Sequence, residues 1–380
     1  MPAALFTELS VWTAAGGGPA RTGLFPRPVA LKPKPARQLA ARGAVQAATV
    51  FDPAGRAFVA DMAGWVQAWE NGEEPRWRRQ LDGAMSATPA VDPGGGRLFL
   101  GTHMGSVYAL TTGDGEVLWQ QRLPAAGDPR ILSDLLFEVG SRRVVLSSWG
   151  GRFHALDADS GRPVQEWEAG LTPAAGAVAD SRGVLYCLRV VRGTGVVLVR
   201  RTSDGQEVEL HRESEGPRGS GRIAVTAAPV LDEARGRAWF VANDGRTAAL
   251  LLWSVGSARL AGRWPLPCGV QATPALAPDG AVWVADLAGN LHRFTAEAPQ
   301  TQVRYNTGAE YLLAAPVCEA GGRCLVGDPL GRLHEVEPDG RGRVVFEATR
   351  AFQAALSFAP AGDLYLPGTD RRVYVFRNKA

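Results

Sequence analysis

Three histidines are the side chains most suited to metal chemistry, because neutral imidazole is a common metal ligand. His154, His292 and His334 each stand three positions after a glycine, and Tyr108 and Tyr374 take the same place in two further copies of the pattern. Residues that recur once per repeat lie a whole repeat apart, whereas zinc needs its nitrogen ligands at about 2.0–2.1 Å. We therefore expect a packing role for the histidines, and we predict neither catalytic residues nor metal ligands.

The cysteines and the usual enzyme motifs offer little further chemistry. Cys318 and Cys324 flank a short Gly-Gly turn, across which a disulfide is sterically possible in an oxidising compartment. Cys187 and Cys268 are isolated, and we expect all four thiols to be reduced. The sequence contains no Gly-x-Ser-x-Gly elbow, no Gly-x-x-x-x-Gly-Lys loop and no His-Glu-x-x-His helix. Hydrolase, nucleotide-binding and metalloprotease functions therefore lack their essential residues.

A glycine turn followed by an alternating strand recurs along the chain. Clear copies occupy residues 105–110, 151–156, 289–294 and 331–336, and weaker copies occupy residues 64–69, 195–200 and 245–250. An eighth copy, at residues 371–376, has arginine in place of the glycine. The copies follow one another at intervals of 40 to 50 residues, which matches the roughly 40–45 residues of a four-stranded propeller blade. We predict an all-β, eight-bladed β-propeller of four-stranded antiparallel blades.

Each predicted blade has the same internal order. An inner strand of small residues, as at 86–91 and 271–276, precedes a turn rich in Asp, Pro and Gly and then a second strand. The glycine hairpin leads into the third strand. The outer strand often ends in a tryptophan that can fill the wedge between neighbouring blades; these residues are Trp77, Trp119, Trp167 and Trp264.

The last blade lacks sequence for its fourth strand, because only four residues follow Phe376. We expect residues 36–41 to supply that strand and to close the ring, which leaves no long unpaired edge. This assigns residues 36–378 to a single propeller. Residues 1–35 contain several prolines, and we expect them to form an extended arm against a rim or side of the ring.

At this point the residues resemble a known family. Residues 109–119, with Ala109, Gly115 and Trp119, are similar to the tryptophan-docking stretch of the pyrroloquinoline-quinone-type propellers, and residues 12–23 look like the segment that often opens them. The family includes quinoprotein alcohol dehydrogenases and, in a non-catalytic branch, propeller-type outer-membrane assembly factors. The resemblance implies the fold over nearly the whole chain, whereas one fold hosts many unrelated functions.

The resemblance also defines what an enzyme of this family would need. Its catalytic members are longer and hold the quinone with a calcium cluster, a stacking tryptophan, a catalytic aspartate and often adjacent cysteines. This sequence has no adjacent cysteines, and no stretch gathers the oxygen ligands that calcium requires. We therefore expect no cofactor, and we keep pyrroloquinoline quinone with calcium as an alternative.

The composition of the chain limits the cellular locations and the kinds of partner that we expect. The 41 basic residues include only three lysines and balance 38 acids to a net charge of +3, which argues for solubility rather than for a nucleic-acid site. The start of the sequence has no basic, apolar export signal, and no apolar run approaches the roughly 20 residues that span a bilayer. We expect a cytoplasmic protein as written, or an exported one if a leader has been removed.

We expect partners to bind at one face of the ring, where the turns between second and third strands meet the connections between blades. Asp61, Asp286 and Asp328 precede hairpin glycines there and form an acidic arc. The long connection after blade 4 makes the opposite side basic, and Trp149 is an aromatic anchor. The basic residues are Arg189, Arg192, Arg212, Arg218 and Arg222.

From the residues of this face we predict that the chain is a non-enzymatic scaffold or assembly factor that binds a protein or an extended peptide. The first alternative is a quinone-binding sensor or quinone-dependent dehydrogenase. The second is a propeller that associates with nucleic acid or another polyanion, which would show steep salt dependence.

Overall fold

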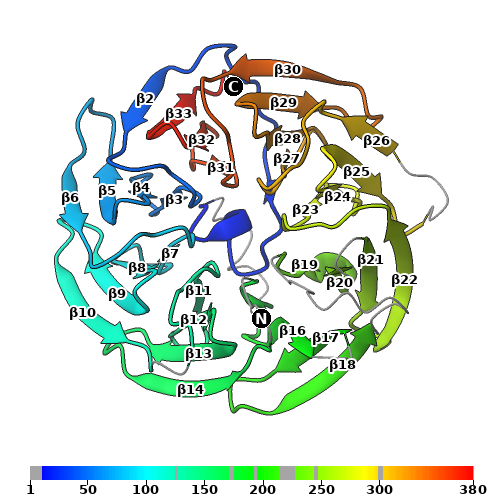
Figure 1. The fold of residues 1–380 in the computed structure, drawn as a ribbon, viewed down its shortest axis with the longest axis horizontal. Coiled ribbons are helices and arrows are strands. Elements are labelled where there is room, and N and C mark those ends of the chain that lie inside the picture. The colour runs from blue at the N-terminus through cyan, green and yellow to red at the C-terminus, as the bar shows by residue number, and fades with distance from the viewer. Residues whose placement is uncertain are drawn as a thin grey trace.

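Eight β-sheets surround a central axis in the computed structural model of the chain (Figure 1). The structure describes residues 11–124, 127–170, 175–191, 195–213, 227–243, 247–297 and 303–379. Within these ranges the only helical elements are two 3-10 turns, η1 (Ala15–Gly17) and η2 (Glu233–Arg235). The predicted all-β, eight-bladed propeller is therefore confirmed.

The sheets follow one another around the ring in chain order, and each blade runs from an inner to an outer strand. The strands of blades 1 to 4 are β3 (Val50–Phe51), β4 (Ala57–Ala60), β5 (Trp65–Trp69), β6 (Trp77–Gln80), β7 (Ala90–Val91), β8 (Arg97–Gly101), β9 (Ser106–Thr111), β10 (Val117–Arg122), β11 (Leu136–Glu138), β12 (Arg143–Ser148), β13 (Arg152–Asp157), β14 (Pro163–Glu168), β15 (Val178–Ala179), β16 (Leu185–Val191), β17 (Gly195–Arg201) and β18 (Glu207–Glu213).

Blades 5 to 8 continue the pattern, and two strands from the start of the chain join blades 7 and 8. The remaining strands are β19 (Val230–Asp232), β20 (Arg237–Asn243), β21 (Ala248–Ser254), β22 (Arg259–Leu266), β23 (Ala275–Leu276), β24 (Val282–Ala285), β25 (Asn290–Phe294), β26 (Val303–Asn306), β27 (Val317–Glu319), β28 (Cys324–Gly327), β29 (Arg332–Val336), β30 (Gly342–Glu347), β31 (Ser357–Phe358), β32 (Leu364–Gly368), β33 (Arg372–Phe376), β1 (Leu24–Phe25) and β2 (Arg37–Ala40).

The outer tryptophans dock on the following blade, as predicted. The Trp77 indole N–H donates a 2.9 Å hydrogen bond to the Thr112 carbonyl, and Trp119 makes the equivalent 3.1 Å bond to Ala158. A Cβ added to Gly115 would lie 2.5 Å from the Trp77 ring, so only glycine leaves room for the docked indole. An indole ring from one blade thus packs against a glycine backbone of the next blade and fills the wedge between the two.

The ring closes with a strand from the start of the chain. Strand β2 pairs antiparallel with β33, with Arg37 opposite Val375 and Ala40 opposite Arg372. The closure predicted for residues 36–41 is thus confirmed, and the outer edge of β33 is covered.

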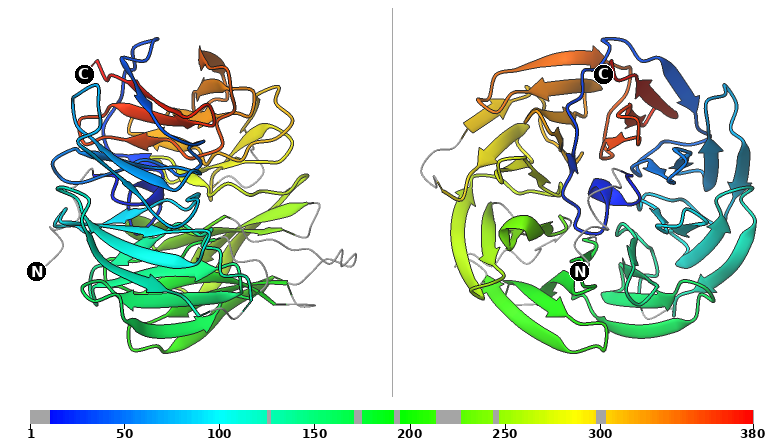
Figure 2. Two further views of the ribbon diagram at one scale, coloured as in Figure 1. Left: turned by 60° about the vertical axis from the view of Figure 1, so that its left-hand side comes forward. Right: turned by 180° about the vertical axis from the view of Figure 1, so that it is seen from behind.

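Residues 11–25, which we name the plug, lie in the centre of the ring rather than against a rim or side (Figures 1 and 2). The plug binds the innermost strands of six blades through its backbone carbonyls. The carbonyls of Trp12, Thr13, Pro19, Ala20, Thr22 and Gly23 accept hydrogen bonds from the N–H groups of Phe51, Val91, Ala179, Leu231, Leu276 and Cys318, in that order. Inner strands of a propeller present unpaired backbone groups to the axis, and the plug satisfies them.

The other two blades are reached by side chains. Arg21, only 1% exposed, donates hydrogen bonds to the carboxylate and carbonyl of Asp134, just before β11 of blade 3. Phe25 stacks on Phe358 of blade 8 with ring centroids 4.7 Å apart. The plug therefore contacts all eight blades.

Candidate partner-binding face

The two ends of the ring differ in what covers them. The plug forms hydrogen bonds with inner strands close to the turn that joins each inner strand to the second strand of its blade. In blade 1, for example, it bonds to Phe51, which directly precedes the turn closed by Asp52 and Arg56. The plug therefore covers the end of the ring where these turns lie, which we name the plugged face. Antiparallel strands reverse direction at each turn, so the turns between second and third strands lie at the other end, with the connections between blades. We name this end, which includes Asp61, Trp149 and Leu330, the connection face.

The three aspartates of the predicted acidic arc lie on the connection face, but each has 0% exposed surface. Asp61 accepts hydrogen bonds of 2.9 to 3.0 Å from the backbone N–H groups of Arg42, Gly43, Ala63 and Trp65. Its carboxylate thus joins the hairpin turn of blade 1 to the connection that enters this blade. The arc is not an exposed acidic surface, because its carboxylates are buried and accept hydrogen bonds from the backbone N–H groups of their turns.

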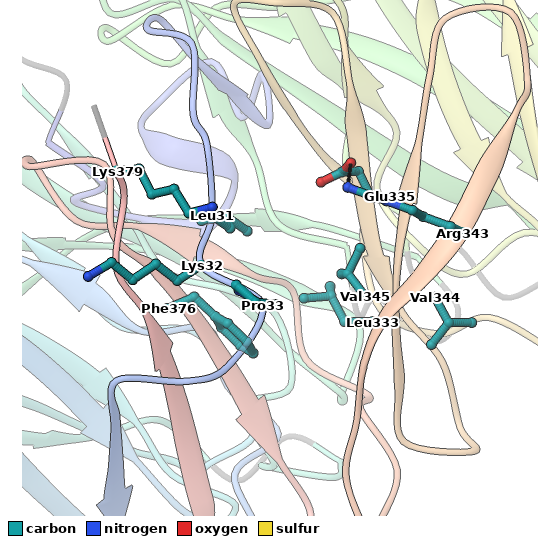
Figure 3. Close-up of a pocket in the computed structure, with 10 residues that line it drawn as sticks. All are labelled: Leu31, Lys32, Pro33, Leu333, Glu335, Arg343, Val344, Val345, Phe376 and Lys379. Carbon is teal, nitrogen blue, oxygen red and sulfur yellow. Dashed lines mark hydrogen bonds and ion pairs between the residues drawn. The ribbon is translucent and has the colours of Figure 1, made fainter.

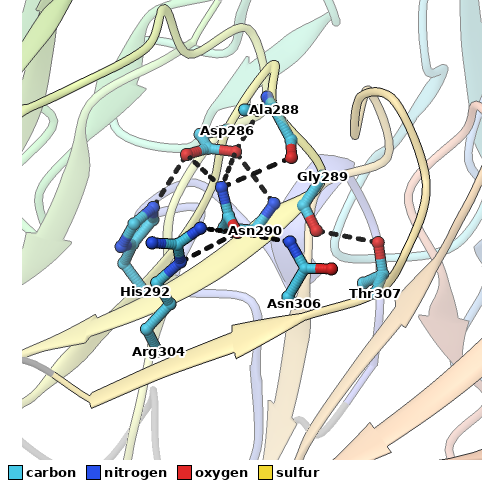
Figure 4. A network of polar contacts seen from close by, with 8 residues as sticks. All are labelled: Asp286, Ala288, Gly289, Asn290, His292, Arg304, Asn306 and Thr307. Carbon is cyan, nitrogen blue, oxygen red and sulfur yellow. Dashed lines mark hydrogen bonds and ion pairs between the residues drawn. The ribbon is translucent and has the colours of Figure 1, made fainter.

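Asp286 has the same role in blade 6 (Figure 4). Its carboxylate accepts hydrogen bonds from the backbone N–H of Asn290 at 2.8 Å and lies 2.8 Å from Nε2 of His292. The Asn290 side chain in turn accepts from Arg304 and Asn306. Burial raises the pKa of Asp286, but the hydrogen bonds from His292 and Asn290 outweigh it and hold the pKa below its ordinary value.

Asp328 repeats the arrangement in blade 7, and the aspartate–histidine pair recurs there with His334. Its carboxylate lies 2.9 Å from His334 Nε2, and the other ring nitrogen lies 3.1 Å from the Tyr305 hydroxyl of the preceding blade. Burial raises the pKa of Asp328, and the bonds from His334 and Arg332 lower it by more. The imidazole is a bridge between a turn and a neighbouring blade.

The predicted basic side is largely neutralised where the structure describes it. Arg189 lies 2.9 Å from the Glu207 carboxylate, and Arg212 forms two hydrogen bonds with Glu209. Arg212 lies in the outermost strand β18 rather than in the connection between blades. The predicted residues Arg192, Arg218 and Arg222 lie outside the described residues.

Trp149 stands at the hairpin turn of blade 3 on the connection face and is half-buried. The Arg130 guanidinium lies 5.8 Å from its ring centroid and is itself held by Asp128. On the same face the side chains of Met104 and Leu330 are 45% and 58% exposed. The connection face therefore carries exposed apolar side chains at its hairpin turns.

Sequence reasoning missed a group of exposed arginines on this face, at blades 7, 8 and 1. These are Arg42, Arg350, Arg371 and Arg372. The available signal was the substitution of arginine for the hairpin glycine at position 371.

Two hollows lie away from the connection face. One of about 490 Å³ lies on the plugged face, where Trp12, Pro53 and Phe137 contribute to its wall. The other, about 380 Å³, lies where the chain crosses from blade 7 to blade 8, between Lys32, Leu333 and Phe376 (Figure 3).

A quinone bound with calcium would need six to eight oxygen ligands around the ion. In the part of the chain that the structure describes, no three His, Cys, Asp or Glu side chains come together as a metal site. The plug occupies the centre of the ring, with Trp12 bonded to the inner strand of blade 1. We therefore derive no reaction step through such a group.

Eight blades, of which blade 7 is extended to five strands by β1, together with docked tryptophans and a leading segment inside the ring define a quinoprotein-type β-propeller. The chain belongs to the family described as outer membrane protein assembly factor BamB, whose model matches residues 11–203 and 64–305. No helix among the described residues is long and apolar enough to cross a membrane.

Solved structures share the fold at low sequence identity. BamB from Moraxella catarrhalis is 18% identical with a TM-score of 0.74, covering 92% of this chain and 100% of its own. Quinohemoprotein alcohol dehydrogenase from Comamonas testosteroni is 13% identical with a TM-score of 0.76, covering 97% and 81%. The Dos1 propeller is 10% identical with a TM-score of 0.71, covering 91% and 94%. No curated protein matched the sequence.

Proposed function

We propose that this chain is a non-enzymatic scaffold that binds a protein or an extended peptide through its connection face. The plug is the observation that carries the proposal. It occupies the centre of the ring and hydrogen-bonds to the inner strands of six blades, so the axis serves as structural core. The opposite end keeps its turns and connections available to a partner.

The side chains of the connection face support this role. Met104 and Leu330 are exposed, and Trp149 is a half-buried aromatic side chain held by Arg130. Binding energy in protein interfaces concentrates in a few aromatic and arginine side chains, whose apolar neighbours exclude water. The matching family is named for an assembly factor of outer membrane proteins, and we propose a comparable assembly role for this chain.

Affinity capture with mass spectrometry tests the proposal. The tagged chain is compared with a Met104→Ser/Trp149→Ala variant, and the matched control is Leu118→Ser/Val164→Ser, which removes similarly exposed apolar side chains from outer strands. We expect the first pair to reduce retention of a specific partner by about tenfold or more and the control to retain it. Equal retention by all three proteins would remove the connection face from the proposal.

Reconstitution separates this function from the quinone alternative. Purified protein is incubated with pyrroloquinoline quinone and calcium, passed through a desalting column and examined by absorption spectroscopy. We expect no chromophore to be retained. A stoichiometric chromophore would favour the enzyme or sensor and would contradict the scaffold.

A further inference from the structure

We propose that the exposed arginines at the closure of the ring bind an acidic peptide segment of the partner. This inference rests on the proposed function and assigns it a ligand chemistry. The group, which we name the arginine corner, consists of Arg42, Arg350, Arg371 and Arg372.

Backbone contacts bring these arginines together from three segments of the chain. Arg371 lies in the hairpin turn of blade 8 between β32 and β33, and Arg372 is the first residue of β33. The N–H of Ala41, next to Arg42, donates a 2.9 Å hydrogen bond to the Arg371 carbonyl. Thr369 in the same turn donates through its hydroxyl to Ala351, next to Arg350, at 3.0 Å. The corner is thus built where the first and last parts of the chain meet.

No ion pair within the described part of the chain balances the arginine corner. All four side chains are exposed, and none forms an ion pair with any residue that the structure describes. In the same turn Asp370 accepts a hydrogen bond from the Tyr374 hydroxyl, and Arg372 also contacts that hydroxyl. By contrast, Arg189 and Arg212 on the other side of the ring are held by glutamates. Among the described arginines, these four without an ion pair therefore lie at the closure of the ring rather than in blade 4.

The backbone of Arg371 is strained. Its φ is 67°, in the left-handed region where five other blades have glycine at the same turn position, with φ between 75° and 89°. These glycines are Gly64, Gly105, Gly151, Gly289 and Gly331. A side chain disfavours this conformation, and such outliers concentrate at binding sites. Because glycine would adopt this turn without strain, we infer that the Arg371 side chain has a role outside the turn.

The surroundings favour a peptide as the ligand. Guanidinium groups bind carboxylates with paired hydrogen bonds, and four in one place suit a segment with several Asp or Glu residues. The Arg42 guanidinium lies 5.9 Å from the Trp65 ring, and the Arg350 carbonyl lies against the turn that carries the exposed Leu330. Apolar side chains beside the cations complement a peptide that alternates acidic and apolar residues.

Fluorescence anisotropy with labelled peptides tests the arginine corner. The probes are a twelve-residue peptide of alternating Glu and Leu with polar ends, its Gln analogue, and a single-stranded oligonucleotide of similar charge. The test variant is Arg350→Gln/Arg371→Gly/Arg372→Gln. The matched control, Arg122→Gln/Arg162→Gln/Arg259→Gln, removes three exposed arginines from outer positions. Circular dichroism verifies that both variants are folded.

We expect the acidic peptide to bind the natural chain and the control, and to bind the test variant roughly tenfold more weakly or worse. The Gln analogue should bind no protein. Absence of peptide binding, equal loss in both variants, or tighter binding of the oligonucleotide would overturn the inference. If the test variant still captures the partner in the affinity experiment while Met104→Ser/Trp149→Ala does not, the arginine corner is wrong and the scaffold proposal stands.

Discussion

The Arg21 guanidinium lies 3.2 Å from the Asp134 carboxylate, and it also donates a 3.0 Å hydrogen bond to the Ala177 carbonyl. Asp134 belongs to the approach to blade 3 and Ala177 to that of blade 4, so one buried side chain ties the plug to two neighbouring blades. Burial lowers the pKa of Arg21, and Asp134 opposes that shift, which keeps the ion pair formed. The plug is therefore anchored by charge as well as by backbone hydrogen bonds.

Replacing Arg21 by alanine should destabilise the propeller. The change removes a buried cation and leaves buried acceptors without a donor, but Asp134 is about one-third exposed and regains water. We expect a loss of about 2–3 kcal/mol in the free energy of unfolding. Urea denaturation followed by tryptophan fluorescence measures it. The exposed Arg162→Ala serves as the control, and an equal effect of the two changes would show that the ion pair contributes nothing.

Two glycines of the plug should differ in how much stability is lost when each is replaced by alanine. Gly23 has a φ of 63°, and an added Cβ would lie 3.0 Å from the Ala275 Cβ. Gly18 has an extended backbone with no atom within 4 Å of an added Cβ. We expect Gly23→Ala to cost about 1–2 kcal/mol and Gly18→Ala to change stability by less than about 0.5 kcal/mol. Thermal melts compare the melting temperatures of the two variants. Equal melting temperatures would contradict the observed course of the plug.

Much of the fold was predictable because its signals are local. The hairpin position of Gly64, with a φ of 81°, needs a residue that tolerates the left-handed region, and this requirement recurs in the sequence once per blade. The closing strand followed from counting strands. The course of the plug was not predictable, because backbone carbonyls carry its hydrogen bonds and no side-chain pattern records them.

The burial of the aspartates on the connection face was not predicted, for a different reason. Asp61, Asp286 and Asp328 each precede a hairpin glycine by three residues, which is the pattern of an aspartate that accepts hydrogen bonds from its own turn. Read in that way, the sequence would have predicted buried carboxylates. Arg212 follows Glu209 by three residues, yet their pairing depends on the length of β18, which the sequence did not delimit.

Acid should destabilise the protein through the turn aspartates. The pKa values of Asp286 and Asp328 are lowered in the folded state. A lowered folded pKa stabilises the fold above the unfolded value of about 3.9, and this contribution disappears as the pH falls through the folded pKa. We expect the free energy of unfolding to fall from about pH 5 downward. Urea denaturation across this range should show a shallower decline in Asp286→Asn/Asp328→Asn, and an unchanged slope would exclude these carboxylates as the cause.

Thiol reactivity should distinguish one cysteine from the rest. Cys318 and Cys324 lie opposite each other in β27 and β28, and both are free and buried. Burial raises the pKa of Cys187 to about 12 and that of Cys324 well above its ordinary value, so their reactive thiolates are scarce at neutral pH. Only Cys268 is partly exposed. We therefore expect titration with a disulfide reagent to modify one thiol rapidly in the native protein, to modify none in Cys268→Ser, and to reach all four only in denaturant. Rapid reaction of a second thiol in the native state would show that its blade opens easily, and reaction of Cys318 would contradict the hydrogen bond by which the plug holds its strand.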